Sequence, residues 1–145
     1  MATYPLPFLP KVPYHDVPGA RNTYFGAGRN GPYPTHGACD LIAPAGTPVL
    51  SIEDGELIRF YWFYDDQNDS GCVKHTWALD VKHLTFIGRY GEVSPTLPEA
   101  IQKKLQSKDK SVSEGEVLAT IGQQCGDAML LQHTTPLLRI LPKAS

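Results

Sequence analysis

Apolar residues in this chain come in short runs that glycine and proline interrupt. There are 13 glycines and 13 prolines among 145 residues. Such punctuation favours several strands joined by turns over long helices. Residues 49–52 have the pattern of a strand, residues 53–55 that of a turn, and residues 56–64 that of a second, aromatic-rich strand. We therefore expect a hairpin here, within a mainly β fold.

A regular alternation of apolar and other residues predicts the next strand. Trp77, Leu79 and Val81 recur at the two-residue period of a strand with one buried face, and His83 continues that face. The polar stretch 65–71 before it has the composition of a loop. Further strands are expected over three segments, namely 84–93, 117–121 and 137–141.

The chain offers one good helix candidate. Pro98 can open a helix over residues 99–106, and such a short helix would lie at the periphery of a β-sheet domain. A length of 145 residues is typical of a single domain with one core. We expect one domain over residues 1–145, with a proline-rich extension over residues 1–13.

Charge and hydropathy argue against two classes of partner. The formal net charge is -2, and no basic cluster is longer than the pair Lys103 and Lys104. Nucleic acid is therefore not expected as a partner. No apolar run approaches the roughly 20 residues of a membrane-spanning helix, so we expect no membrane insertion. Residues 1–10 lack the basic start and apolar stretch of a signal peptide, so any export would use another route.

The chain has three cysteines, which are Cys39, Cys72 and Cys125. They are widely spaced and odd in number, which argues against a disulfide framework and against a zinc site of the C-x-x-C type. At most one internal disulfide can form.

Candidate chemistry is concentrated around His36 and Asp40. A spacing of four puts both side chains on one side of a helix or of a strand. Pro34 and Gly37 disfavour a helix and indicate an extended segment that leads into a turn. Cys39, at odd spacing from both, is then expected on the opposite face. Imidazole and carboxylate are common zinc ligands, but the pair alone is more typical of a histidine that bonds an aspartate within a loop.

A longer string favours the metal-ligand alternative. Residues 36–49 read His-Gly-Ala-Cys-Asp-Leu-Ile-Ala-Pro-Ala-Gly-Thr-Pro-Val, followed by Asp54 and Gly55. This string closely resembles the first metal motif of the lysostaphin-type (LytM-like) zinc endopeptidases. The resemblance extends over about residues 14–140, through segments 25–29, 78–83, 89–92 and 108–122.

The resemblance implies a compact, mostly antiparallel β-domain with a substrate groove over the sheet. It also implies Zn²⁺ as cofactor and cleavage of peptide bonds in peptidoglycan as activity. In such hydrolysis zinc polarises the carbonyl and activates a water, while a nearby acid/base moves the proton to the leaving amine.

The second metal motif of the family, H-x-H near the C-terminus, is incomplete here. Residues 127–135 contain one histidine, His133. Aligning His133 with the family's ligating histidine implies His36, Asp40 and His133 as zinc ligands with an open site. Following the M-L-H-F-E form of some relatives instead places Leu131 at the ligand position and leaves two ligands. We favour the first alignment.

The resemblance also implies roles for other residues. The family has a histidine in a Y-x-H-L segment that helps to stabilise the transition state, and Glu92 stands at its position. Glu92 is therefore the first candidate for the catalytic acid/base. His83 is the second, although a structural role inside the fold suits it too. Arg89 can bind a substrate carboxylate or pair with an acid, and Tyr61 and Tyr64 can line the groove or pack the sheet.

Together these features predict a zinc-dependent peptidoglycan endopeptidase, either a phage lysin or a secreted antibacterial effector. It would act on the cell wall, in the periplasm or outside the cell, after export by another route or release by lysis. A delivery or anchoring protein would be its partner. The alternative is a catalytically inactive family member that acts as a binding or regulatory module. A weaker reading of residues 108–122 as a lipoyl-like carrier lacks the expected lysine hairpin.

Overall fold

The computed structural model describes residues 2–8, 18, 39–125 and 137–140, with residues 39–40 and 137–140 described by their backbone. In this part of the chain the elements are β1 (Cys39–Ile42), β2 (Pro48–Leu50), β3 (Gly55–Gln67), β4 (Val73–Lys82), β5 (Ile87–Val93), α1 (Glu99–Leu105), β6 (Ser111–Val112), β7 (Val117–Thr120) and β8 (Leu137–Ile140). The expected β-rich domain with antiparallel sheets and one short helix is confirmed.

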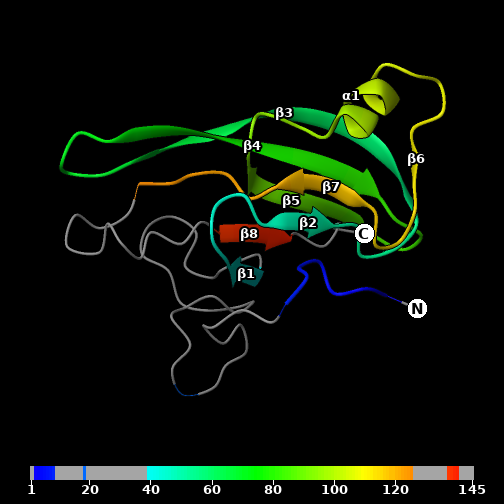
Figure 1. The fold of residues 1–145 in the computed structure, drawn as a ribbon, viewed down its shortest axis with the longest axis horizontal. Helices are drawn as coiled ribbons and strands as arrows, with labels where there is room; N and C mark the ends of the chain where they lie inside the picture. The colour runs from blue at the N-terminus through cyan, green and yellow to red at the C-terminus, as the bar shows by residue number, and fades with distance from the viewer. Residues whose placement is uncertain (1, 9–17, 19–38, 126–136, 141–145) are drawn as a thin grey trace.

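The strands form two sheets (Figure 1). The larger sheet has six strands in the order β1-β8-β5-β4-β3-β6, and each neighbouring pair is antiparallel. The smaller sheet pairs β2 with β7. A bridge between Val93 and Ile121 and a hydrogen bond from the Ser94 N–H to the Thr120 carbonyl join the end of β5 to the end of β7. These contacts hold the smaller sheet against the larger one.

The core lies where both sheets and the helix meet. Its fully buried members include Leu57 and Leu79 from the larger sheet, Val49 and Leu118 from the smaller one, and Ile101 from α1. Each such side chain contributes about 1.5–3 kcal/mol on burial. Core packing thus sets which face of each strand turns inward.

The helix agrees with the sequence expectation to within one residue. Pro98 stands directly before it, as expected, and Ile101 is its buried residue. Its outer surface carries charged residues, including the exposed pair Glu99 and Lys103, whose charged atoms lie 3.1 Å apart. Among the described residues there is no helix long and apolar enough to cross a membrane.

The expected hairpin between residues 49–52 and 56–64 is wrong. β2 does not pair with β3, because its backbone groups bond to β7 and the N–H of Leu50 bonds to the carbonyl of Pro5. β3 instead pairs with β4 along one edge and with β6 at Gly55 and Glu56 on the other. Pairing follows the partners available in three dimensions, which a short run such as Val49–Leu50 does not encode.

One smaller expectation also needs correction. The predicted loop over 65–71 is too long, because β3 continues to Gln67 and β4 begins at Val73. Strands are present at the expected segments 117–121 and 137–141, where β7 pairs with β2 and β8 pairs with β1 and β5. The long β3–β4 hairpin extends well beyond the neighbouring strands (Figure 1).

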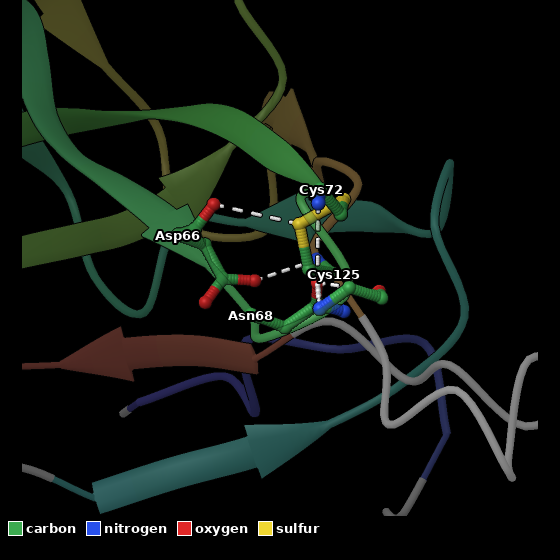
Figure 2. The surroundings of a disulfide bond; sticks show 5 residues. Asp66, Asn68, Cys72 and Cys125 are labelled. Carbon is green, nitrogen blue, oxygen red and sulfur yellow. Dashed lines mark hydrogen bonds between the residues drawn. A yellow bond between two sulfur atoms is a disulfide. The ribbon is translucent and has the colours of Figure 1, made fainter.

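A disulfide between Cys72 and Cys125 fastens the tip of this hairpin to the chain that follows β7 (Figure 2). The two Cα atoms lie 5.9 Å apart, and 53 residues separate the cysteines in sequence. Side-chain hydrogen bonds hold both ends. The side-chain amide oxygen of Asn68, Oδ1, accepts the Cys72 N–H at 3.1 Å, and the Asp66 carboxylate accepts the Cys125 N–H at 2.6 Å. The turn therefore presents Cys72 to its partner.

Removal of the disulfide should lower the free energy of unfolding by about 2–4 kcal/mol, because a cross-link over a long loop restricts the unfolded chain. Chemical denaturation of Cys125→Ser without reductant measures the loss, and Cys39→Ser is the matched control that should lie closer to wild type. Added reductant should bring wild type to the level of Cys125→Ser. Three free thiols in wild type unfolded without reductant would contradict the bond.

Candidate functional site

Polar and aromatic side chains gather on one face of the large sheet. Residues paired across strands share a face, as do alternate residues along a strand. Arg59, Asp80 and Arg89 form one cross-strand row, and Tyr61, Ala78 and Gly91 form the next. Tyr64 and Thr76 follow in a third. We call this surface the polar face, made of Arg59, Tyr61, Tyr64, Thr76, Ala78, Asp80, Arg89 and Gly91.

Two irregularities in β3 put its residues on this face. In a regular strand Leu57 and Arg59 would share a face, but a register shift between them sends Leu57 into the core and Arg59 to the polar face. A second shift, between Trp62 and Tyr64, brings Tyr64 to the face that Tyr61 already occupies. The hydroxyl of Thr76 supports the second bulge, since it donates to the Tyr64 carbonyl at 2.7 Å.

Asp80 is the centre of a charged cluster. Its side chain is only 4% exposed, and it accepts the Nε–H of Arg59 at 3.1 Å and that of Arg89 at 3.0 Å. Arg89 adds a second bond from Nη2 at 3.3 Å. Both guanidinium groups lie over the ring of Tyr61, with Cζ of Arg59 at 4.2 Å and Cζ of Arg89 at 5.7 Å from its centroid. Sequence reasoning missed Arg59 and Asp80.

The electrostatics of the cluster follow from this geometry. Burial raises the pKa of Tyr61, and the negative charge of Asp80 raises it further. The hydrogen bonds to Asp80 raise the pKa of Arg89 above the ordinary value of an arginine. Two guanidinium groups and one carboxylate leave the cluster with a net positive charge at neutral pH.

Glu92 lies at the other end of the polar face. It is 1% exposed, and the hydroxyl of Tyr64 donates a hydrogen bond to its Oε1. Its φ of 63° falls in the left-handed region, at the register shift between β4 and β5. The Gly122 N–H donates to its carbonyl at 3.0 Å. A non-glycine residue held in this conformation is a feature that functional sites share.

His83 is buried inside the fold and is not part of the polar face. It is 3% exposed, and Nδ1 donates to the Asp54 carbonyl at 3.1 Å. Its Nε2 then accepts the Tyr90 hydroxyl at 2.8 Å, and the same hydroxyl accepts the Ile52 N–H at 3.1 Å. Gly88 leaves room for the ring, since a Cβ there would lie 3.1 Å from Nε2. His83 and Glu92 contact different partners, so the two predicted catalytic residues are not brought together.

The predicted metal ligands lie mostly outside the described residues. His36 and His133 belong to that part, and Asp40 is placed by its backbone in β1. Asp40 is in register with Arg139 of β8, and Arg139 with Gly91 of β5. This register puts the backbone of Asp40 on the same cross-strand row as Tyr61. Within the described part of the chain, no three histidine, cysteine or acidic side chains are grouped to hold a metal.

Because β1 and β8 are antiparallel, the end of β1 that follows His36 pairs with the end of β8 farthest from His133. The residue paired with Asp40 is thus an arginine.

Comparisons of the chain with protein-family models, with curated proteins and with solved structures find no match. What the site can do therefore follows from its own chemistry.

The Tyr90 hydroxyl should stabilise the fold below about pH 10. Burial raises the pKa of Tyr90 from 10.0 to about 12. A group whose pKa is higher in the folded state contributes stability that is complete below the unfolded pKa and is lost as pH rises through the folded one. We expect wild type to lose about 2–3 kcal/mol between pH 10 and 12 through this group.

Tyr90→Phe removes that part of the pH dependence and leaves the Ile52 N–H and His83 Nε2 without their partner. It should cost about 1–3 kcal/mol at neutral pH. Urea unfolding of both proteins from pH 7 to 12 measures the difference, in which the titration of other groups cancels. Parallel curves for the two proteins would show that Tyr90 does not carry the effect.

Proposed function

We propose that the chain is a zinc-dependent peptidoglycan endopeptidase of the lysostaphin type, which cleaves peptide bonds in cross-bridges or stem peptides. The observation that carries the proposal is the buried carboxyl group of Glu92, hydrogen-bonded to Tyr64. It adjoins the row whose register includes Asp40. Asp40 belongs to the string that resembles the family's first metal motif. A buried acid two strands from a candidate metal ligand suits hydrolysis.

His36, Asp40 and His133 would hold the zinc ion. Two imidazoles and a carboxylate form a donor set that zinc accepts, with a position left open for water or substrate. When bound, zinc would polarise the scissile carbonyl and make water a better nucleophile.

The protein's own side chains would do the rest. Glu92 would accept a proton from the attacking water and pass it to the leaving amine. The Tyr64 hydroxyl would hold the Glu92 carboxyl in one orientation, because it donates to Oε1. Tyr61 and Arg89 would position the substrate peptide along the polar face. His83 would serve the fold, since both of its ring nitrogens have partners inside it.

The alternative is a binding module that has lost catalysis, and two observations favour it. The residue in register with Asp40 is Arg139, and residues 127–135 contain a single histidine. A guanidinium group beside a carboxylate would satisfy the acid without a metal. In either case we propose action at the cell wall, with a delivery or anchoring partner. A disulfide is consistent with such an oxidising location.

Metal analysis separates the two candidates. Protein purified without added zinc should contain about one zinc ion per chain, and Asp40→Ala and His133→Ala should each lose it. His75→Ala is the matched control, because His75 is exposed and bonds Asp65. A wild-type protein that binds no zinc even when zinc is supplied would refute the enzyme and leave the binding module.

Activity on purified cell wall tests the role of Glu92. Glu92→Gln preserves the shape of the side chain but removes the base, so cell-wall cleavage should fall by about 10²–10⁴-fold. Glu56→Gln, on an exposed position of β3, is the control and should retain activity. Release of peptide fragments, with circular dichroism to verify folding, is the measurement. Equal cleavage by wild type and Glu92→Gln would remove Glu92 from the mechanism.

A further inference from the structure

The Arg59–Asp80–Arg89 cluster holds two guanidinium groups in fixed orientations at the surface. Each arginine points its Nε–H at the buried Asp80 carboxylate, and both guanidinium groups lie over the Tyr61 ring. The side chains of Arg59 and Arg89 are nevertheless 57% and 30% exposed. An arginine fixed at its inner edge loses little conformational freedom when its outer edge binds a ligand.

Donors for such a ligand remain on both arginines. Within the described part of the chain, the Nη1 and Nη2 groups of Arg59 and the Nη1 group of Arg89 make no hydrogen bond. The next cross-strand pair on this face, Glu56 and Lys82, carries opposite charges and leaves the local charge unchanged. The surface above Asp80 is therefore positive and rich in N–H donors.

The fold does not need both arginines to neutralise Asp80. Arg89 alone donates to both carboxylate oxygens. Arg59 adds a third charge-assisted bond from a more exposed position. Its outward donors are what distinguish it.

We propose that Arg59 and Arg89, held by Asp80 and Tyr61, form a binding site for a carboxylate group of a peptide that lies across the polar face. Planar guanidinium donors match the two oxygens of a carboxylate. The choice of a peptide as ligand rests on the proposed function, whereas the carboxylate preference rests on the cluster itself. Arg59, which sequence reasoning missed, is a binding residue of this site.

The register sets the distance of this site from Asp40. Arg89 lies two residues along β5 from Gly91, and Gly91 is two strands away from Asp40. With strands about 4.8 Å apart and about 3.4 Å per residue, the backbones of Arg89 and Asp40 are about 12 Å apart. An extended peptide covers that distance in about three or four residues. In this proposal, about three or four peptide residues separate the bound carboxylate from the peptide bond that would be cleaved at the proposed metal site.

The test compares two N-acetylated Ala-Gly-Gly-Ala-Ala peptides, one with a free C-terminal carboxylate and one with a C-terminal amide. Nitrogen-15 NMR of the Nε–H groups of Arg59 and Arg89 monitors binding to the full chain at millimolar peptide. The acid should shift both signals and bind at least about fivefold more tightly than the amide. Equal shifts from the two peptides, or none from either, would overturn the site.

Two variants test whether the preference for the acid peptide comes from the Arg59–Asp80–Arg89 cluster. Arg59→Gln should reduce the preference for the acid, measured at the Arg89 signal, to less than about twofold, whereas Lys82→Gln removes the same charge from the next row and should keep it. Equal losses in both variants would mean that charge alone binds the peptide, and would overturn the proposal.

This NMR measurement depends on neither zinc binding nor cleavage. A zinc-free chain that prefers the acid thus refutes the enzyme alone, and an active enzyme without the preference refutes this site alone.

Discussion

The two bulges of β3 decide which of its residues lie on the polar face of the large sheet. The period of a strand is two residues, so one extra residue exchanges the inner and outer faces beyond it. Without the first bulge, Arg59 would share the core face with Leu57, and burial of an unpaired guanidinium costs several kcal/mol. Leu57 and Leu79 are buried on one side while Arg59 reaches Asp80 on the other. Core burial and ion pairing therefore select the same register.

Sequence reasoning was successful where a single segment carries its own signal. The helix after Pro98 and the strand that contains Trp77, Leu79 and Val81 depend on local spacing and are confirmed. The expectation of a single buried face in that strand is wrong, because Ala78 and Asp80 are buried on its other face as well. Strand pairing was not predictable in the same way, because β2 could be satisfied by any neighbouring edge and its true partner, β7, lies about 70 residues later. The bulges were equally hidden, since an aromatic run such as 60–64 has no clear period.

The residues of the candidate site show the same contrast between what the sequence predicts and what depends on distant strands. Glu92, Tyr61, Tyr64 and Arg89 were predicted from a resemblance, and the structure puts the last three on one face with the Glu92 carboxyl at its end. The roles of these residues stay predictions, as does the zinc ligand set. Asp80 could not be identified from the sequence, because a strand aspartate becomes the centre of a cluster only when its neighbours on two other strands are arginines.

Glu92 shows how the fold supports the site. A glutamate at a φ of 63° is strained by roughly 1 kcal/mol or more. It remains there because the Gly122 N–H holds its carbonyl and the Tyr64 hydroxyl holds its carboxyl. Tyr64 reaches Glu92 only because the second bulge of β3 turns it to the polar face. The proposed catalysis and the proposed carboxylate binding would require the same of this surface, which is to hold a peptide in one position against fixed polar groups. The bulges, Asp80 and the strained turn at Glu92 all act to fix those groups.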